Sequence, residues 1–205
     1  MGVSIHYRGT LTDKRAIHQI IEEVEELART MHWPFRVLDE DWGQAPTVEI
    51  ESQEGGILSL DGHAGLKGIS FQPHPRCETV FLFFNASCVI TSPIHVALSA
   101  EEGYPASAQW LAVKTQFAGP DTHVVLVKLL RYLQGKYLHD LEVSDEGGYW
   151  ETSDFDQLTA NMNQVNEAIE QLTQDLQERR QDSDIVTKIE QLLKELKDRE
   201  RGGEE

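Results

Sequence analysis

Several features are scarce in this chain of 205 residues, and each scarcity excludes a class of protein. Only two cysteines occur, Cys77 and Cys88, so a disulfide framework is excluded and reduced thiols in the cytoplasm are expected. No apolar run approaches the length of a membrane span, and the N-terminal residues lack the apolar stretch of a secretory signal. The sequence motifs of phosphate-binding loops, serine hydrolases and zinc proteases are also missing. We therefore expect a cytoplasmic protein that makes no membrane contact.

Basic residues are scarce as well, with 18 Lys and Arg against 35 Asp and Glu, which gives a net charge of −17. The excess is spread along the chain, with 11 basic and 21 acidic residues in residues 1–152 and 7 and 14 in residues 153–205. A field of this sign repels phosphate backbones and anionic membranes, so no nucleic-acid binding is expected. The charge suits a basic partner or an acidic inhibitor that imitates nucleic acid, and it also serves plain solubility.

Helical patterning is the most abundant signal, and it lies near the C-terminal end. Residues between the apolar positions of this segment are mostly Gln, Asn, Asp and Glu, and the apolar positions recur at steps of three and four: Phe155, Leu158, Met162, Val165, Ile169, Leu172 and Leu176. A narrow apolar stripe on a polar helix needs a second helix to cover it. Asp154 and Gln157 have the spacing of a capping box, so we expect the helix to begin there.

This seam is interrupted after Leu176 and starts again with Ile185, Ile189, Leu192 and Leu196. The interruption contains Asp182-Ser183-Asp184, which are good helix caps and poor interior residues, so the pattern favours an antiparallel helical hairpin. The alternative is one long helix with a stutter. In both cases the chain divides into an α+β domain, residues 1–152, and a heptad-patterned segment, residues 153–205.

The first 152 residues mix the two periodicities. Alternation of apolar and polar residues predicts strands at 3–8 and 110–117 and several short strands between 47 and 96. Apolar repeats of helical period predict one helix after Thr12 and another from Pro120 to Leu138, whereas residues 144–153 look like a link. Short turns between strands imply antiparallel pairing. The expected fold class is α+β: an antiparallel sheet with two helices on one face, followed by a C-terminal helical hairpin or coiled coil.

If the helices cover one face of that sheet, the opposite face would gather cationic and amide groups that suit an anionic or polar ligand: His6, Arg8, Gln72, Lys114 and Gln116. The alternatives are an ordinary face exposed to water or a face covered by the heptad helices. His123 is a further candidate, because helical geometry turns it inward near a helix N-terminus. There a neutral imidazole would either polarise a substrate carbonyl or hydrogen-bond a backbone group in the core.

A metal site is the third candidate. His74 and Cys77 are separated by two residues, a spacing typical of metal ligands. A hairpin turning at Asn85-Ala86 would place Cys77 opposite Ile94 and close to His95, and the three side chains would then hold zinc with one open position. One short motif carries this prediction, and Pro75 and Pro93 leave the register open.

Five segments together resemble a family of uncharacterised bacterial proteins: SIHYRG near the start, PHPRCE at 73–78, KTQFAGP at 114–120, LLRYL at 129–133 and DEGGYWET at 145–152. The resemblance covers residues 1 to about 155 and excludes most of the heptad segment. It implies a bacterial, cytoplasmic origin and carries no activity, cofactor or catalytic residue with it.

The leading functional expectation is a protein-interaction or assembly role, through a protein partner or self-association of the C-terminal helices. The residues expected to pack are Leu158, Met162, Val165, Ile169, Leu172, Leu176, Ile189, Leu192 and Leu196. One alternative is a small metal-dependent or hydrolase-like enzyme that uses the polar sheet face. The other is an acidic inhibitor that imitates nucleic acid.

Overall fold

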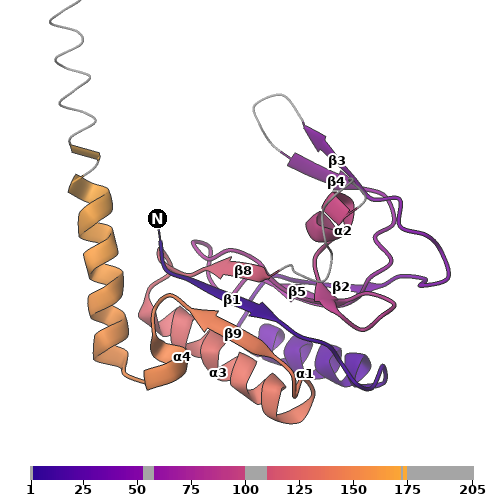
Figure 1. Ribbon diagram of the computed structural model, residues 1–205, viewed down its shortest axis with the longest axis horizontal. Helices are drawn as coiled ribbons and strands as arrows, with labels where there is room; N and C mark the ends of the chain where they lie inside the picture. Colours follow the sequence, from indigo (N-terminus) through magenta and orange to yellow (C-terminus); the bar gives the residue numbers. More distant parts are fainter. Residues whose placement is uncertain (1, 53–57, 100–109, 172, 175–205) are drawn as a thin grey trace, which may run out of the picture. The chain divides into compact units, whose positions relative to one another are not determined.

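The computed structural model describes residues 2–52, 58–99, 110–171 and 173–174 (Figure 1). The fold is α+β, with helices and antiparallel sheets, as the sequence predicts. Two compact units are present: Gly2–Met162, called the body below, and the residues that follow Met162. The body extends past the boundary predicted at residue 152, because the first turns of the C-terminal helix pack within it.

The described residues of the body form three antiparallel sheets. Alternation along the first strand buries Ile5 and Tyr7 and leaves His6 half-buried, as a sheet with one covered face requires. The Tyr7 hydroxyl donates to the Phe81 carbonyl at 2.9 Å and accepts from the Phe81 amide at 3.1 Å, so it links two sheets. The sheet orders are β8-β1-β9 (β1 Ser4–Arg8, β8 Leu111–Lys114, β9 Glu142–Asp145), β2-β5-β6-β7 (β2 Phe35–Asp39, β5 Lys67–Phe71, β6 Val80–Phe84, β7 Ile90–Thr91) and β3-β4 (β3 Glu49–Ser52, β4 Leu58–Asp61).

Two helices, α1 (Ala16–Thr30) and α3 (Pro120–Lys136), lie on the same side of the strands (Figure 1). Each helix turns an apolar stripe inward, with Ile20 and Val24 buried on α1 and Leu126 and Leu130 buried on α3. The helices are joined at Glu23, whose carboxylate accepts hydrogen bonds from three side chains of the α3 region: Tyr132, Lys136 and Tyr137. The predicted arrangement of two helices on one face is therefore present.

Two local predictions are wrong. Residues 93–96 were expected to continue a strand, but Pro93–Ser99 forms helix α2 and β7 ends at Thr91. Pro93 suits a first helical turn because a backbone N–H in that turn would have no intrahelical partner, so its absence in proline loses no hydrogen bond. Ser92 Oγ caps the helix by accepting the His95 amide at 3.2 Å. The predicted link at 144–153 contains the end of β9 and a short helix, α4 (Tyr149–Thr152).

The C-terminal helix begins as predicted. Residues 155–171 are helical, and the Asp154 carboxylate caps the helix by accepting the Gln157 amide at 3.0 Å. Leu158 and Met162, two members of the heptad seam, are buried in the body. The seam residues beyond Ile169 lie outside the described residues, namely Leu172, Leu176, Ile189, Leu192 and Leu196, and the hairpin stays a prediction. Among the described helices, none has the length and apolarity needed to cross a membrane.

Candidate functional site

His123 is the centre of a buried polar network in the body. Gly119 begins α3 with a backbone φ of 89°, a conformation that favours glycine, and Pro120 occupies the first turn. His123 follows in that turn, and its imidazole is completely buried, on the inward side that the helical period predicts. A buried imidazole needs polar partners for both ring nitrogens. They come from two other elements, β9 and the end of β8.

The two ring nitrogens face a threonine and an aspartate. His123 Nδ1 lies 2.8 Å from the Thr115 hydroxyl, and Nε2 lies 3.0 Å from Asp145 Oδ1. All three side chains are completely buried. The Nε2–Oδ1 contact is within ion-pair distance, although the N–H is not aligned with that oxygen as in a good hydrogen bond. Thr115 Oγ1 also lies 3.3 Å from the Val3 carbonyl, to which it can donate.

Asp145 is held as an anion by its surroundings. Its Oδ1 accepts the Gly147 amide at 2.7 Å, and its Oδ2 accepts the Trp150 amide at 2.8 Å. Burial raises the pKa of Asp145, but the His123 imidazole and these two amides outweigh burial and hold the pKa below its ordinary value. Removing these donors would leave a buried carboxylate without partners, which strongly destabilises a folded protein.

The network also holds the first turns of the C-terminal helix, residues 155–162, which we call the helix root. Gln116 is buried, with its Oε1 accepting the Val3 amide at 3.0 Å and its Nε2 donating to the Met162 carbonyl at 2.8 Å. Asn161 Nδ2 donates to the Gly147 carbonyl at 3.1 Å. A Cβ on Gly147 would come within 2.6 Å of Leu158 and 3.0 Å of His123, so the root packs directly over the network.

Thr115, His123 and Asp145 are the residue types of a nucleophile, a base and an orienting carboxylate. A catalytic set needs an opening through which a substrate reaches the hydroxyl, and here the three side chains are sealed beneath the helix root. In this structure the network links β8, α3, β9 and the root to one another. Thr115 and Asp145 are therefore site residues that sequence reasoning missed, and their role is to position neighbouring elements.

Three of the predicted ligand residues do share one face of the three-stranded sheet. There Arg8 donates to Glu142 at 3.1 and 2.7 Å and lies 4.6 Å above the Trp110 ring, and His6 Nε2 lies 3.5 Å from Glu146. Lys114 lies over the ring of Phe117. Carboxylates thus already lie against Arg8 and His6, two of the three groups on which an anionic ligand would depend.

The other two predicted face residues lie elsewhere. Gln72 follows β5 in the four-stranded sheet, where its amide donates to the Cys77 carbonyl at 2.9 Å. Gln116 belongs to the buried network, because β8 ends at Lys114 and the strand alternation does not reach position 116. The structure therefore does not bring the predicted set together on one face.

The three predicted zinc ligands are not brought together either. Within the described ranges, no group of three or more His, Cys, Asp or Glu side chains is arranged to hold a metal ion. His74 Nδ1 accepts the Arg76 amide, and His95 sits on α2 beside Ser92 rather than on a strand opposite Cys77. Burial, together with the charge of Glu78, raises the pKa of the Cys77 thiol to about 12, which disfavours the thiolate that binds metals.

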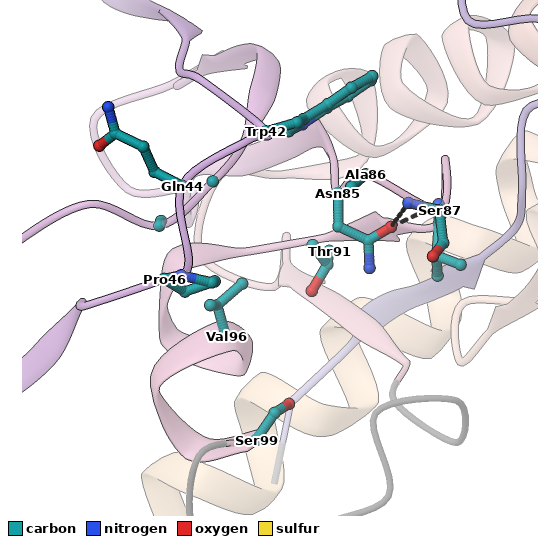
Figure 2. A pocket seen from close by; sticks show the side chains of 12 residues that line it. Trp42, Gln44, Pro46, Asn85, Ala86, Ser87, Thr91, Val96 and Ser99 are labelled. Atoms are coloured by element: carbon teal, nitrogen blue, oxygen red, sulfur yellow. Dashed lines mark hydrogen bonds between the residues drawn. The ribbon is translucent and has the colours of Figure 1, made fainter.

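A hollow of about 240 Å³ lies elsewhere in the body, and we call it the Trp42 pocket (Figure 2). Its walls come from the loop before β3, the link before β5, the turn between β6 and β7, and helix α2. None of its lining residues is charged. The sequence shows only a polar loop around Trp42 and a hairpin turn at Asn85, and no local pattern indicates that the two meet.

No protein-family model matches this chain, and no curated protein or solved structure matches it either. The KTQFAGP and DEGGYWET segments, which carry the resemblance noted above, supply Thr115, Gln116 and Asp145. These segments meet in the buried network, although they are distant in the chain.

Proposed function

We propose that this protein has an assembly role and pairs with a second copy of itself through its C-terminal helix. The single observation that carries the proposal is the continuity of the helix: Leu158 and Met162 of its root are buried in the body, and the same apolar seam then runs on past Met162. The body covers Leu158 and Met162, whereas the next members of the seam, Val165 and Ile169, remain to be covered by another helix.

The anchoring of the root supports a role in assembly. Gln116 and Asn161 tie the root to the body through backbone carbonyls, and Leu158 is completely buried. These contacts fix the position of the root within the body. A helix with a fixed root loses less entropy when it pairs.

The residues that flank the seam favour a second copy as the partner. With Met162 and Ile169 at a positions of the heptad, the e and g positions between residues 161 and 173 carry no charge: Asn161, Asn166, Ala168 and Thr173. Like charges at e and g would repel between identical helices, and a chain of net charge −17 is at special risk of this. The acidic residues Glu167 and Glu170 occupy the outer positions f and b instead.

A double substitution in the full-length chain tests the proposal. Val165→Asp with Ile169→Asp places two carboxylates in the seam, where pairing would have to bury them. Light scattering after size-exclusion chromatography should show the wild type at the mass of two chains and the variant at the mass of one. We expect the dimer dissociation constant to rise at least ~100-fold, or ~2.7 kcal/mol.

The matched control is Asn163→Asp with Gln171→Asp, which adds the same charge to the same helix at exposed positions. This control should keep the mass of two chains. A wild type that stays at the mass of one chain at high micromolar concentration would contradict self-association, and so would an equal loss of mass in the control.

A further inference from the structure

The Trp42 pocket is free of charge in a chain where charge is common. Charged residues make up 26% of the sequence, yet the pocket lining contains none. Trp42 lies at one end of the hollow and Ser99 at the other, with Asn85 and Thr91 between them (Figure 2). An uncharged lining with an aromatic ring, amides and hydroxyls recognises a neutral polar ligand, because an ionic ligand would lose its hydration without gaining a counter-charge.

Asn85 supplies an oriented donor. Its Oδ1 accepts the backbone amides of Ser87 at 3.0 Å and Val89 at 3.1 Å, which fixes the plane of the carboxamide. The Nδ2 end is thereby turned into the hollow beside Thr91 (Figure 2). Nδ2 has no acceptor among the described residues, so two N–H groups with a fixed direction face the pocket.

Trp42 supplies the aromatic wall. The ammonium groups of Lys14 and Lys67 lie 5.0 and 5.4 Å from its ring centroid and help to hold the ring in place. Its indole Nε1 is buried and has no hydrogen-bond partner in the described part of the chain. A buried donor without a partner is destabilising, so the body tolerates a penalty to keep an indole at this position.

We infer that the Trp42 pocket binds a single uncharged sugar ring. A pyranose offers a face of C–H groups for the indole and a rim of hydroxyls that both accept from Asn85 Nδ2 and donate to neighbouring oxygens. A volume of about 240 Å³ accommodates one such ring. Phosphate- or carboxylate-bearing ligands find no cation in the lining and are repelled by a net charge of −17.

The test is an NMR titration of the ¹⁵N-labelled full-length protein with glucose, galactose, mannose and N-acetylglucosamine. At least one of them should shift the indole N–H signal of Trp42 and the side-chain amide signals of Asn85, with a dissociation constant in the millimolar range. Glucuronate, glucose 6-phosphate and adenosine serve as charged and planar comparisons, and they should bind at least tenfold more weakly.

Asn85→Asp is the most informative variant, because the carboxylate still accepts the two amides of the turn but lacks the Nδ2 donor. We expect it to weaken sugar binding at least tenfold, and Trp42→Ala to abolish it. Trp110→Ala, outside the pocket, should bind like the wild type. The inference is overturned if none of the four sugars shifts these signals, if Asn85→Asp binds as well as the wild type, or if adenosine or a charged sugar binds more tightly.

Discussion

Asp145→Ala should lower the free energy of unfolding by about 3–5 kcal/mol, because two backbone amides lose a charged acceptor and each such hydrogen bond contributes roughly 1.5–3 kcal/mol. Three groups lose their partner in this variant: the His123 imidazole at 3.0 Å and the amides of Gly147 and Trp150. None of them gains access to water, because the helix root covers the site. Urea unfolding at pH 7, followed by circular dichroism, measures the loss.

Glu151→Ala is the matched control, since Glu151 is an exposed carboxylate in the neighbouring helix α4. Its effect should stay within about 0.5 kcal/mol of the wild type, as for most surface substitutions. Asp145→Asn should fall between the two, because an amide oxygen still accepts a backbone amide while the negative charge beside His123 is lost. A loss below about 1 kcal/mol for Asp145→Ala would show that the network is not the fastening we describe.

The same network makes stability depend on pH in a defined direction. The pKa of Asp145 is lower in the folded protein than in the unfolded chain, where an aspartate titrates near ~3.9. Its contribution is therefore fully present above the unfolded pKa and is lost as the pH falls through the folded pKa. The difference in unfolding free energy between the wild type and Asp145→Asn should be larger at pH 7 than at pH 3. The surface pairs Arg8–Glu142 and His6–Glu146 are the same in both proteins, so their contribution cancels in the difference.

Patterns of short range predicted the fold class and the longer helices. The α+β class, the helix that contains Ile20 and Val24, the helix after Pro120 and the capped start of the heptad helix each depend on neighbours within a few residues. Helix α2 was missed because seven residues after a proline are too few to display a helical period, and residues 93–96 also fit a strand.

The sites could not be predicted in the same way, because their members meet only through tertiary structure. His123 was identified by its inward position, but its partner Asp145 ends a four-residue strand in a stretch that looks like a glycine-containing link. The sequence alternation placed Gln116 on the same face as Lys114. Strand β8 ends at Lys114, however, and the Gln116 side chain is buried in the core. The Trp42 pocket draws its walls from four separate segments, and periodicity carries no information about such a meeting.

Gly68→Ala is the second substitution for which we expect a large loss of stability. The added methyl group would clash with the backbone of the neighbouring strand β6. Gly68 has a φ of 142°, which side chains rarely adopt, and it pairs with Phe83 of β6. An alanine Cβ would lie 2.1 Å from the Leu82 carbonyl oxygen and 2.9 Å from the Phe83 Cα. We expect a loss of at least ~3 kcal/mol, since backbone strain and overpacking add at this position.

A glycine-to-alanine change at another position serves as the control, and there we expect a gain in stability. Gly135 lies near the end of α3, and a Cβ there would meet nothing within 4 Å. Gly135→Ala should therefore stabilise the protein by about 0.5–1 kcal/mol, because alanine restricts the unfolded chain and suits a helix. Thermal unfolding of the two variants beside the wild type measures both shifts. The close approach of β5 and β6 requires that Gly68→Ala melts well below the wild type, or fails to fold, while Gly135→Ala gains stability. If Gly68→Ala melts at or above the wild-type temperature, the pairing of Gly68 with Phe83 is contradicted.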